Sequence, residues 1–171
     1  MSSELKPSTV LRRSVLIGVA LLLAGCQARP LYQDTNGETR GALAAIAYSE
    51  ASSRVGLETR NRLIFLTSGG DETKTPQYQV DLEVTSSIGG ILLEAGADTP
   101  NSGRAVATGT YTLKRISDET VLKTGRRQAV ALFDYPRQEF AKLRARRDAE
   151  TRAARELAEL IYADLTMALG R

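Results

Sequence analysis

The sequence predicts an α+β fold: an antiparallel four-stranded sheet with two helices packed on one face, in the order β-α-β-β-β-α. Two observations lead to this prediction. Three consecutive segments, 78–85, 106–116 and 121–134, have the residue pattern of strands, and successive strands joined by short turns pair as an antiparallel meander. Two segments with helical spacing, about 54–67 and 136–169, precede and follow them, and such helices cover one face of a sheet.

One strand and one helix come before the meander. Residues 43–50 alternate weakly between the two sides of a strand. The serines at 52–53 can cap a helix over about 54–67, and the glycines at 69–70 end it. The apolar stripe of this helix consists of Val55, Thr59, Leu63 and Leu66.

The meander begins with the clearest strand signal in the chain. Apolar and polar residues alternate over 78–85, which is the period of a sheet with one wet face. The glycines at 89–90 predict a bulge or bend that leads into a long hairpin tip with a polar loop at 95–103. The next strands, 106–116 and 121–134, are joined by a short turn at 117–120.

The last helix begins near Pro136, a residue suited to a first helical position, and runs to about Leu169. Its first half has one side with almost no bulk, formed by Ala145, Ala149 and Ala153. We expect the second half to pack on the sheet, and the alanine side to be either mildly exposed or pressed close to another surface. The larger residues of the second half are Leu157, Leu160, Ile161, Leu165 and Met167.

An export signal is predicted at the start of the chain. Arg12 and Arg13 precede an apolar segment from Val15 to Ala24, the order of charge and hydrophobicity found in secretory signal peptides. The run Leu23-Ala24-Gly25-Cys26 resembles the lipobox of bacterial lipoproteins. That resemblance implies cleavage before Cys26, a diacylglycerol on its sulfur and an acyl chain on its new amino group.

Cleavage at this point divides the chain into three predicted parts. Residues 1–25 are the lipoprotein signal peptide, residues 26–41 are a lipid-anchored tether, and residues 42–171 form a single α+β domain. Gln27 follows the lipidated cysteine in place of aspartate, which favours sorting to the outer membrane. We therefore expect a lipid-anchored protein on the periplasmic side of that membrane.

The composition excludes several functions. The chain has no histidine, which rules out a Ser-His-Asp triad, a Cys-His pair and a His-ligated zinc site. The net charge of +3 includes Lys6, Arg12 and Arg13 against Glu4 in the leader, so that 20 basic and 19 acidic residues remain after cleavage. This balance argues against nucleic acid as a partner. No metal is predicted, and no cofactor apart from the lipid on Cys26.

One pair of acidic residues could support catalysis. Asp81 and Glu83 point the same way from one strand, and paired carboxylates can perform acid–base chemistry. Exposed acids on a wet strand face are far more often solubilising, so the chain is predicted not to be an enzyme. A carboxylate-based hydrolase is the weakest of the hypotheses.

Six basic residues gather around the last predicted hairpin. Residues on paired strands across a tight turn are neighbours, so these side chains form one patch or the two faces of a hairpin. Arginine forks bind phosphate and carboxylate in bidentate fashion, which points to an anionic ligand; the alternative is an edge strand protected by charge against aggregation. The candidates are Arg104, Lys114, Arg115, Lys123, Arg126 and Arg127.

Several short motifs follow the lipobox along nearly the whole mature chain. They are Arg29-Pro30-Leu31-Tyr32, Arg60-Asn61-Arg62-Leu63, Tyr78-Gln79-Val80-Asp81-Leu82, Gly109-Thr110-Tyr111-Thr112-Leu113 and Arg147-Asp148-Ala149-Glu150, followed by Ala153-Ala154, Leu157-Ala158 and Ile161. This ordered set resembles the lipopolysaccharide-assembly lipoprotein family, LptE. The chain lacks the long C-terminal tail of the larger members of that family.

The resemblance implies a non-enzymatic component of lipopolysaccharide export. Members of the family sit as a plug inside a large outer-membrane β-barrel of the LptD type and bind lipopolysaccharide through basic residues. We therefore expect this chain to be a plug and assembly partner of such a barrel, with the six basic residues as candidates for binding lipopolysaccharide. The alternative is a periplasmic lipoprotein that binds a small ligand or the cell wall and has no barrel partner.

Overall fold

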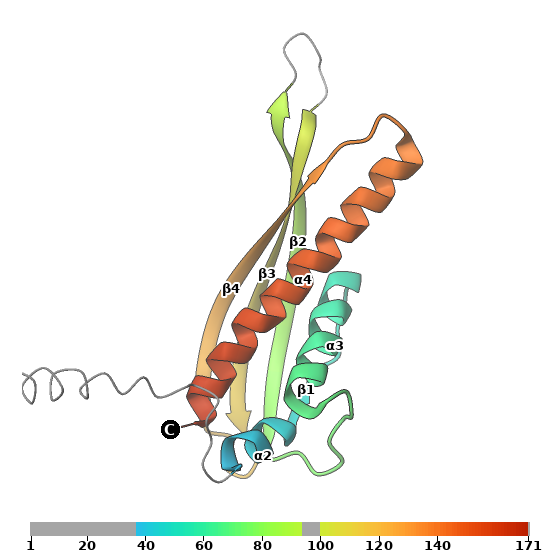
Figure 1. Ribbon diagram of the computed structural model, residues 1–171. Helices are drawn as coiled ribbons and strands as arrows, with labels where there is room; N and C mark the ends of the chain where they lie inside the picture. Colours follow the sequence, from blue (N-terminus) through green and yellow to red (C-terminus); the bar gives the residue numbers. More distant parts are fainter. Residues whose placement is uncertain (1–36, 94–99, 171) are drawn as a thin grey trace, which may run out of the picture. The chain divides into compact units, whose positions relative to one another are not determined.

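Four strands form one mixed sheet, and α-helices pack against one of its faces (Figure 1). The computed structural model describes residues 37–93 and 100–170, which belong to one compact unit. The helices in this part of the chain are α2 (Glu38–Ala44), α3 (Arg54–Ser68) and α4 (Glu139–Leu169). The strands are β1 (Ile46–Tyr48), β2 (Tyr78–Leu93), β3 (Pro100–Arg115) and β4 (Val121–Asp134), in the spatial order β1-β2-β3-β4.

The α+β class and the three-stranded meander are confirmed, but the prediction of a wholly antiparallel sheet is wrong at β1. Strands β2, β3 and β4 pair antiparallel, whereas β1 runs parallel to β2, with Ile46 opposite Tyr78 and Tyr48 opposite Val80. The reason is the helix between them. A strand that is followed by a crossover helix returns to the sheet in the same direction and pairs parallel.

The number of helices also differs from the prediction. Residues 38–41, expected as part of the tether, and 43–44, expected as the start of a strand, belong to α2. Leu43 is buried in the core from this helix, and α2 contacts both α3 and α4. A single buried leucine in a seven-residue helix leaves almost no periodic pattern, which is why the sequence did not indicate α2.

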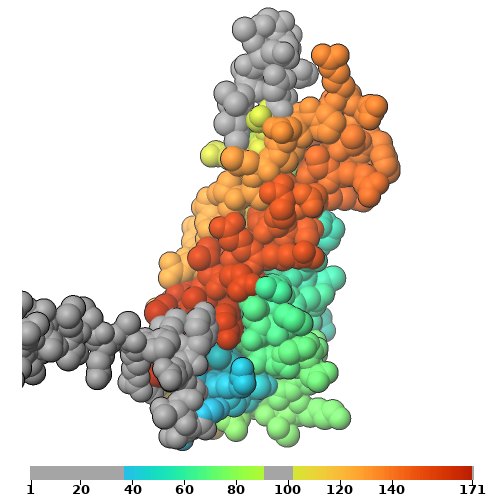
Figure 2. Space-filling view, viewed as in Figure 1, coloured from blue at the N-terminus to red at the C-terminus, as the bar shows by residue number. Residues whose placement is uncertain are grey.

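Helix α3 follows its sequence signals closely. The Ser53 hydroxyl accepts a hydrogen bond from the Gly56 backbone N–H at 3.1 Å, so Ser53 caps the helix. Gly69 adopts a left-handed conformation at φ 77° and ends it. Of the predicted stripe, Val55, Thr59 and Leu63 are buried and Leu66 is partly buried. Figure 2 shows α3 and α4 meeting side by side on the covered face of the sheet.

The β2–β3 hairpin is longer than predicted. Strand β2 continues through Gly89 and Gly90 to Leu93, and β3 already begins at Pro100. The predicted irregularity is present as a shift of register between Gly90 and Leu92. The expected 95–103 loop is therefore strand from residue 100 onwards, while residues 94–99 lie outside the described part of the chain.

Helix α4 has 31 residues, about 46 Å in length. Its alanine side is pressed against a neighbour, which settles the choice that the sequence left open: Ala149 and Ala153 are fully buried, as is Ala154 beside them, and Ala145 is partly buried. These small residues allow α3 to approach so closely that the Thr59 hydroxyl reaches the Ala154 carbonyl at 3.5 Å. Farther along, Leu157 and Ile161 pack over Gly109 of β3 and Leu165 is buried, as expected for the second half of the helix, whereas Leu160 and Met167 are exposed.

Candidate functional site

The two faces of the sheet have different surroundings. Side chains alternate along a strand, and the buried residues Val80, Val84, Ala105, Ala107, Ala129 and Ala131 point toward the helices. The residues between them form the opposite side, which we call the open face: odd-numbered residues of β2 over 79–89, even-numbered residues of β3 over 102–114, and even-numbered residues of β4 over 124–134. Among the described residues, no helix covers the open face (Figure 1).

The hairpin separates the six basic candidates onto different surfaces. Arg104, Lys114 and Arg126 lie on the open face, whereas Lys123 and Arg127 point toward the helices. Arg115 lies at the end of β3 and forms an ion pair with Asp118 at 3.1 Å. The six residues thus occupy two faces of the hairpin and its turn, and do not form one patch.

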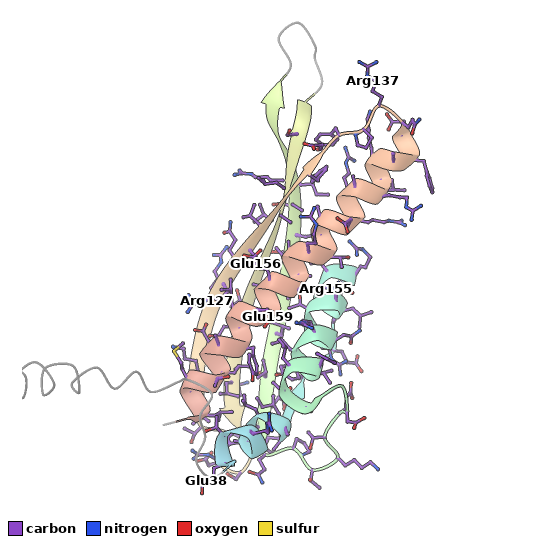
Figure 3. All side chains as sticks on the ribbon, in the orientation of Figure 1. Glu38, Arg127, Arg137, Arg155, Glu156 and Glu159 are labelled. Carbon is purple, nitrogen blue, oxygen red and sulfur yellow. The ribbon has the colours of Figure 1, made fainter. Side chains whose placement is uncertain are left out.

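Arg127 is part of a polar network around the buried Asp164 that joins β3, β4 and α4, and its own side chain is 47% exposed. Its Nε and Nη2 donate to the two carboxylate oxygens of Asp164 at 2.7 and 2.6 Å, and the Tyr111 hydroxyl donates to the same carboxylate at 2.6 Å. The side chain of Asp164 is only 3% exposed. Figure 3 shows Arg127 on β4 beside the second half of α4. The bidentate pair commits the guanidinium of Arg127 to holding α4 on the sheet.

The network shifts the titration of both acidic groups. The hydrogen bonds from Arg127 hold the pKa of Asp164 below its usual value, and the charge of Lys123 acts in the same direction. Burial raises the pKa of Tyr111, and the hydrogen bond to Asp164 raises it further. Asp164 is therefore a carboxylate and Tyr111 a neutral donor across the physiological range.

Lys114, which lies on the open face, also forms an ion pair. Its ammonium group contacts Asp81 at 2.6 Å, and the Gln79 amide donates to the same carboxylate at 3.0 Å. The hydrogen bond from Lys114 lowers the pKa of Asp81. A general acid or base works best with a pKa near the operating pH, so this environment shifts Asp81 away from the value that acid–base chemistry with Glu83 would require.

Arg104 and Arg126 remain as exposed cations on the open face, and neither forms an ion pair with any described residue. Next to Arg104 lies a strip of apolar side chains, while Arg126 is opposite Thr110, farther along the same face. Leu132, which is 62% exposed, is opposite Arg104, and the exposed Val130 is opposite the half-buried Val106. We call these five residues the arginine–valine strip. Arginine beside exposed apolar surface suits a ligand with both an anionic head and an apolar part.

A second feature lies at the other end of the sheet. A hollow of about 340 Å³ is lined by Pro76, Gln77, Tyr78, Arg115, Ile116 and Ser117. Its size is within the range of small-molecule sites, and Arg115 gives it one cationic group. This hollow is the feature that fits the small-ligand alternative.

Other kinds of site can be assessed only over the described residues. Within 37–93 and 100–170, acidic side chains do not gather in groups of three or more that could hold a metal ion. The same ranges contain no helix with the length and hydrophobicity needed to span a membrane. Cys26, the predicted signal peptide and most of the predicted tether lie outside the described residues.

Sequence reasoning missed two parts of this arrangement. One is the pairing of Arg127 with Asp164; an acid within the apolar stripe of Leu157, Ile161 and Leu165 was the signal for a buried ion pair. The other is the apolar strip on β4, where Val130 and Leu132 occupy positions that alternate with the buried alanines.

No family model matches the chain, and no curated protein matches it significantly. Solved structures do. A candidate lipoprotein from Caulobacter crescentus CB15 is 22% identical, with a TM-score of 0.64 over 77% of this chain and 96% of that one. Rare lipoprotein B from Shewanella oneidensis (10% identity, TM-score 0.54, 71% and 92%) and a minor lipoprotein from Acinetobacter baumannii (12%, 0.51, 71% and 88%) are also similar. At these identities the likeness establishes the fold, which this chain shares with bacterial lipoproteins.

Proposed function

We propose that this protein is an outer-membrane lipoprotein that binds lipopolysaccharide on its open face and acts as plug and assembly partner of the lipopolysaccharide-export β-barrel. The lipobox at Cys26, the ordered motifs that resemble the LptE family and the fold shared with bacterial lipoproteins support this proposal. The observation that carries it is the arginine–valine strip, where Arg104 borders exposed apolar side chains and Arg126 lies farther along the same face; neither arginine has an ion-pair partner among the described residues.

The chemistry of the strip matches that of the proposed ligand. Lipopolysaccharide is a phosphorylated amphiphile, so it combines anionic groups with acyl chains. Arg104 and Arg126 can each bind a phosphate in bidentate fashion. Val130 and Leu132 lie on the same face and offer apolar contact. Arg104 borders the apolar residues directly. Arg126 is six residues from Leu132, the residue opposite Arg104, so the two arginines lie about 20 Å apart along the sheet.

In this proposal the protein acts by shape and contact and is not an enzyme. Its single cysteine carries the lipid, and no histidine is available as a general base. The ion pairs of Lys114 and Arg127 support the fold, so that of the six basic candidates Arg104 and Arg126 are the ones we expect to contact the ligand.

The binding test compares two charge reversals of equal size. Arg104→Glu/Arg126→Glu should weaken lipopolysaccharide binding by the purified lipoprotein in detergent about tenfold or more, because two charge-assisted contacts become repulsive. Lys74→Glu/Arg115→Glu makes the same change in net charge away from the open face, and should bind normally. Both double variants should unfold at temperatures close to that of the wild type, since all four side chains are at least partly exposed.

Two results would contradict this assignment. Unchanged binding by Arg104→Glu/Arg126→Glu would exclude the open face as the binding site. Loss of binding only in Lys74→Glu/Arg115→Glu would indicate that the ligand binds in the hollow beside Arg115. That second result favours the alternative function, a lipoprotein that binds a small ligand or the cell wall and has no barrel partner.

A further inference from the structure

The first half of α4 carries an unusual exposed side. Phe140, Leu143, Arg144 and Arg147 follow one another at spacings of three, one and three residues, which places them on one side of the helix. This side is opposite the buried Ala149. Arg137 lies just before the helix and points away from the sheet in Figure 3. We call these five residues the α4 stripe; the turns that carry it extend past the end of α3 (Figure 1).

The apolar members of the α4 stripe are well exposed. Phe140 is 71% exposed, and Leu143 is also on the surface. The guanidinium carbon of Arg144 lies 5.8 Å from the centre of the Phe140 ring, a cation–π contact that leaves the outer side of the ring free. A large aromatic and a leucine held between arginines on one convex helix side form an amphipathic surface without a partner among the described residues.

Charge is distributed unevenly along the helix. Residues 137–147 contain five basic residues and one acid, whereas residues 148–164 contain two basic residues and five acids. Charged residues of the second part form ion pairs with α3, namely Arg54–Glu150, Arg62–Glu159 and Arg155–Glu58. Figure 3 labels Arg155 and Glu159 on this part of α4.

The positive charge of the first part is neutralised much less. Lys142 pairs with Glu139, and Arg146 lies over the Tyr135 ring, with its guanidinium carbon 5.4 Å from the ring centre. Arg137, Arg144 and Arg147 form no ion pair with any described residue. The free end of α4 therefore presents three unpaired guanidinium groups around Phe140 and Leu143.

We propose that the α4 stripe docks on the anionic phospholipid surface of the membrane that carries the lipid anchor. Phe140 and Leu143 insert at the boundary between headgroups and acyl chains, and Arg137, Arg144 and Arg147 contact lipid phosphates. Basic residues flanking exposed aromatic and aliphatic side chains on one helix side are the pattern of helices that lie in the membrane interface. A convex helix side without a pocket suits a bilayer better than the recessed hot spot of a protein interface.

This inference goes beyond the proposed function, because it concerns the lipoprotein before it meets a barrel and does not involve lipopolysaccharide. The length of the predicted tether permits it. The twelve Cα–Cα steps from Cys26 to Glu38 can span up to about 40 Å when the chain is extended. That reach is comparable with the length of α4, so the domain can lie with this helix along the bilayer.

The chain contains no tryptophan, which provides a specific reporter. In Phe140→Trp, made in the full lipidated protein and reconstituted in vesicles, the single tryptophan reports contact with the bilayer. We expect brominated lipids to quench its fluorescence at least twofold in vesicles containing phosphatidylglycerol. The quenching should fall in pure phosphatidylcholine and in high salt, which screens the arginines.

A matched control is available on α3. Phe65 is 56% exposed and lies under Arg62, whose guanidinium carbon is 5.4 Å from the ring centre. Phe65→Trp therefore places tryptophan in a similar setting on another element, and should not be quenched. Adding Arg144→Glu/Arg147→Glu to Phe140→Trp should remove the quenching without unfolding the protein, since both arginines are exposed.

Two results would overturn the proposal. If Phe140→Trp is not quenched in phosphatidylglycerol vesicles, the stripe does not contact lipid, and an acidic protein surface becomes the explanation for its charge. If both tryptophans are quenched equally, the domain has no preferred orientation on the membrane. The vesicles contain neither lipopolysaccharide nor a barrel, so neither result bears on the proposed function.

Discussion

Asp164 is the acidic residue on which the packing of α4 depends. It lies between Ile161 and Leu165 on the buried side of the helix, where an unpaired carboxylate would be costly. Arg127 from β4 and Tyr111 from β3 satisfy it from two different strands. Asp164 thus joins α4 to β3 and β4, and its replacement removes a hydrogen-bonding group that all three elements share.

Replacing Asp164 with asparagine should lower the free energy of unfolding by about 1–3 kcal/mol, because a charged, buried hydrogen-bonding group is lost. Chemical denaturation measures this change. Asp148→Asn on the same helix is the control: its carboxylate pairs with Arg152 in solvent, and exposed pairs contribute about 0–1 kcal/mol. Equal effects of the two substitutions would contradict the structural role of Asp164.

The same pair predicts a dependence on pH. Because the pKa of Asp164 is lowered in the folded state, the ion pair stabilises the fold above the ordinary aspartate pKa of about 3.9 and loses this contribution as pH falls through the lower folded-state value. The difference in unfolding free energy between wild type and Asp164→Asn should therefore be constant from about pH 5 to 7 and narrow below about pH 4. A difference that widens in acid would contradict this assignment.

At the scale of elements, the β3–β4 pair depends on a glycine beside Tyr111. A Cβ atom on Gly125 would lie 2.6 Å from Cζ of the Tyr111 ring, and such overpacking costs about 1–3 kcal/mol. Gly125→Ala should therefore lower the thermal unfolding midpoint clearly. Gly89→Ala in β2 is the control, because a Cβ there meets nothing within 4 Å; if both variants unfold at the same temperature, the close packing of Tyr111 is not essential.

The sequence was sufficient to predict the helices and strands that have strong periodicity or clear end signals. Helix α3, with its serine cap and glycine stop, and the antiparallel order of the three meander strands followed directly from their patterns, although β2 and β3 extend farther than predicted. Helix α2 and the parallel pairing of β1 did not, because both depend on where a short segment is placed by the rest of the fold. The burial of the alanines of α4 was likewise decided by α3, which is distant in sequence.

The candidate site was predictable only in part, for a similar reason. Arg126 and Arg127 are adjacent and chemically identical, yet alternation along β4 turns one to solvent and the other to the helix. The partner of Arg127 is 37 residues away, and no local pattern links the two. Sequence can therefore locate a basic hairpin, while the choice of residues free to bind a ligand requires the tertiary structure.

At the scale of the whole molecule, we propose that a lipid on Cys26 anchors a folded domain whose sheet has one face that the described helices do not cover. Cys26→Ala should prevent lipidation and leave an unprocessed precursor that fractionates differently from the wild type in detergent partitioning. Intact mass spectrometry of the mature wild type should show the added lipid. A variant that is still cleaved and anchored like the wild type would contradict the lipoprotein assignment.

The most direct test of the central proposal is affinity purification of the tagged protein, expressed at its native level and extracted with mild detergent. We expect a large outer-membrane β-barrel protein to be recovered in near-stoichiometric amount, with lipopolysaccharide bound to the complex. The Arg104→Glu/Arg126→Glu variant should retain less lipopolysaccharide per complex. Recovery of the lipoprotein without any barrel would contradict the proposed plug function and favour a lipoprotein that binds a small ligand or the cell wall on its own.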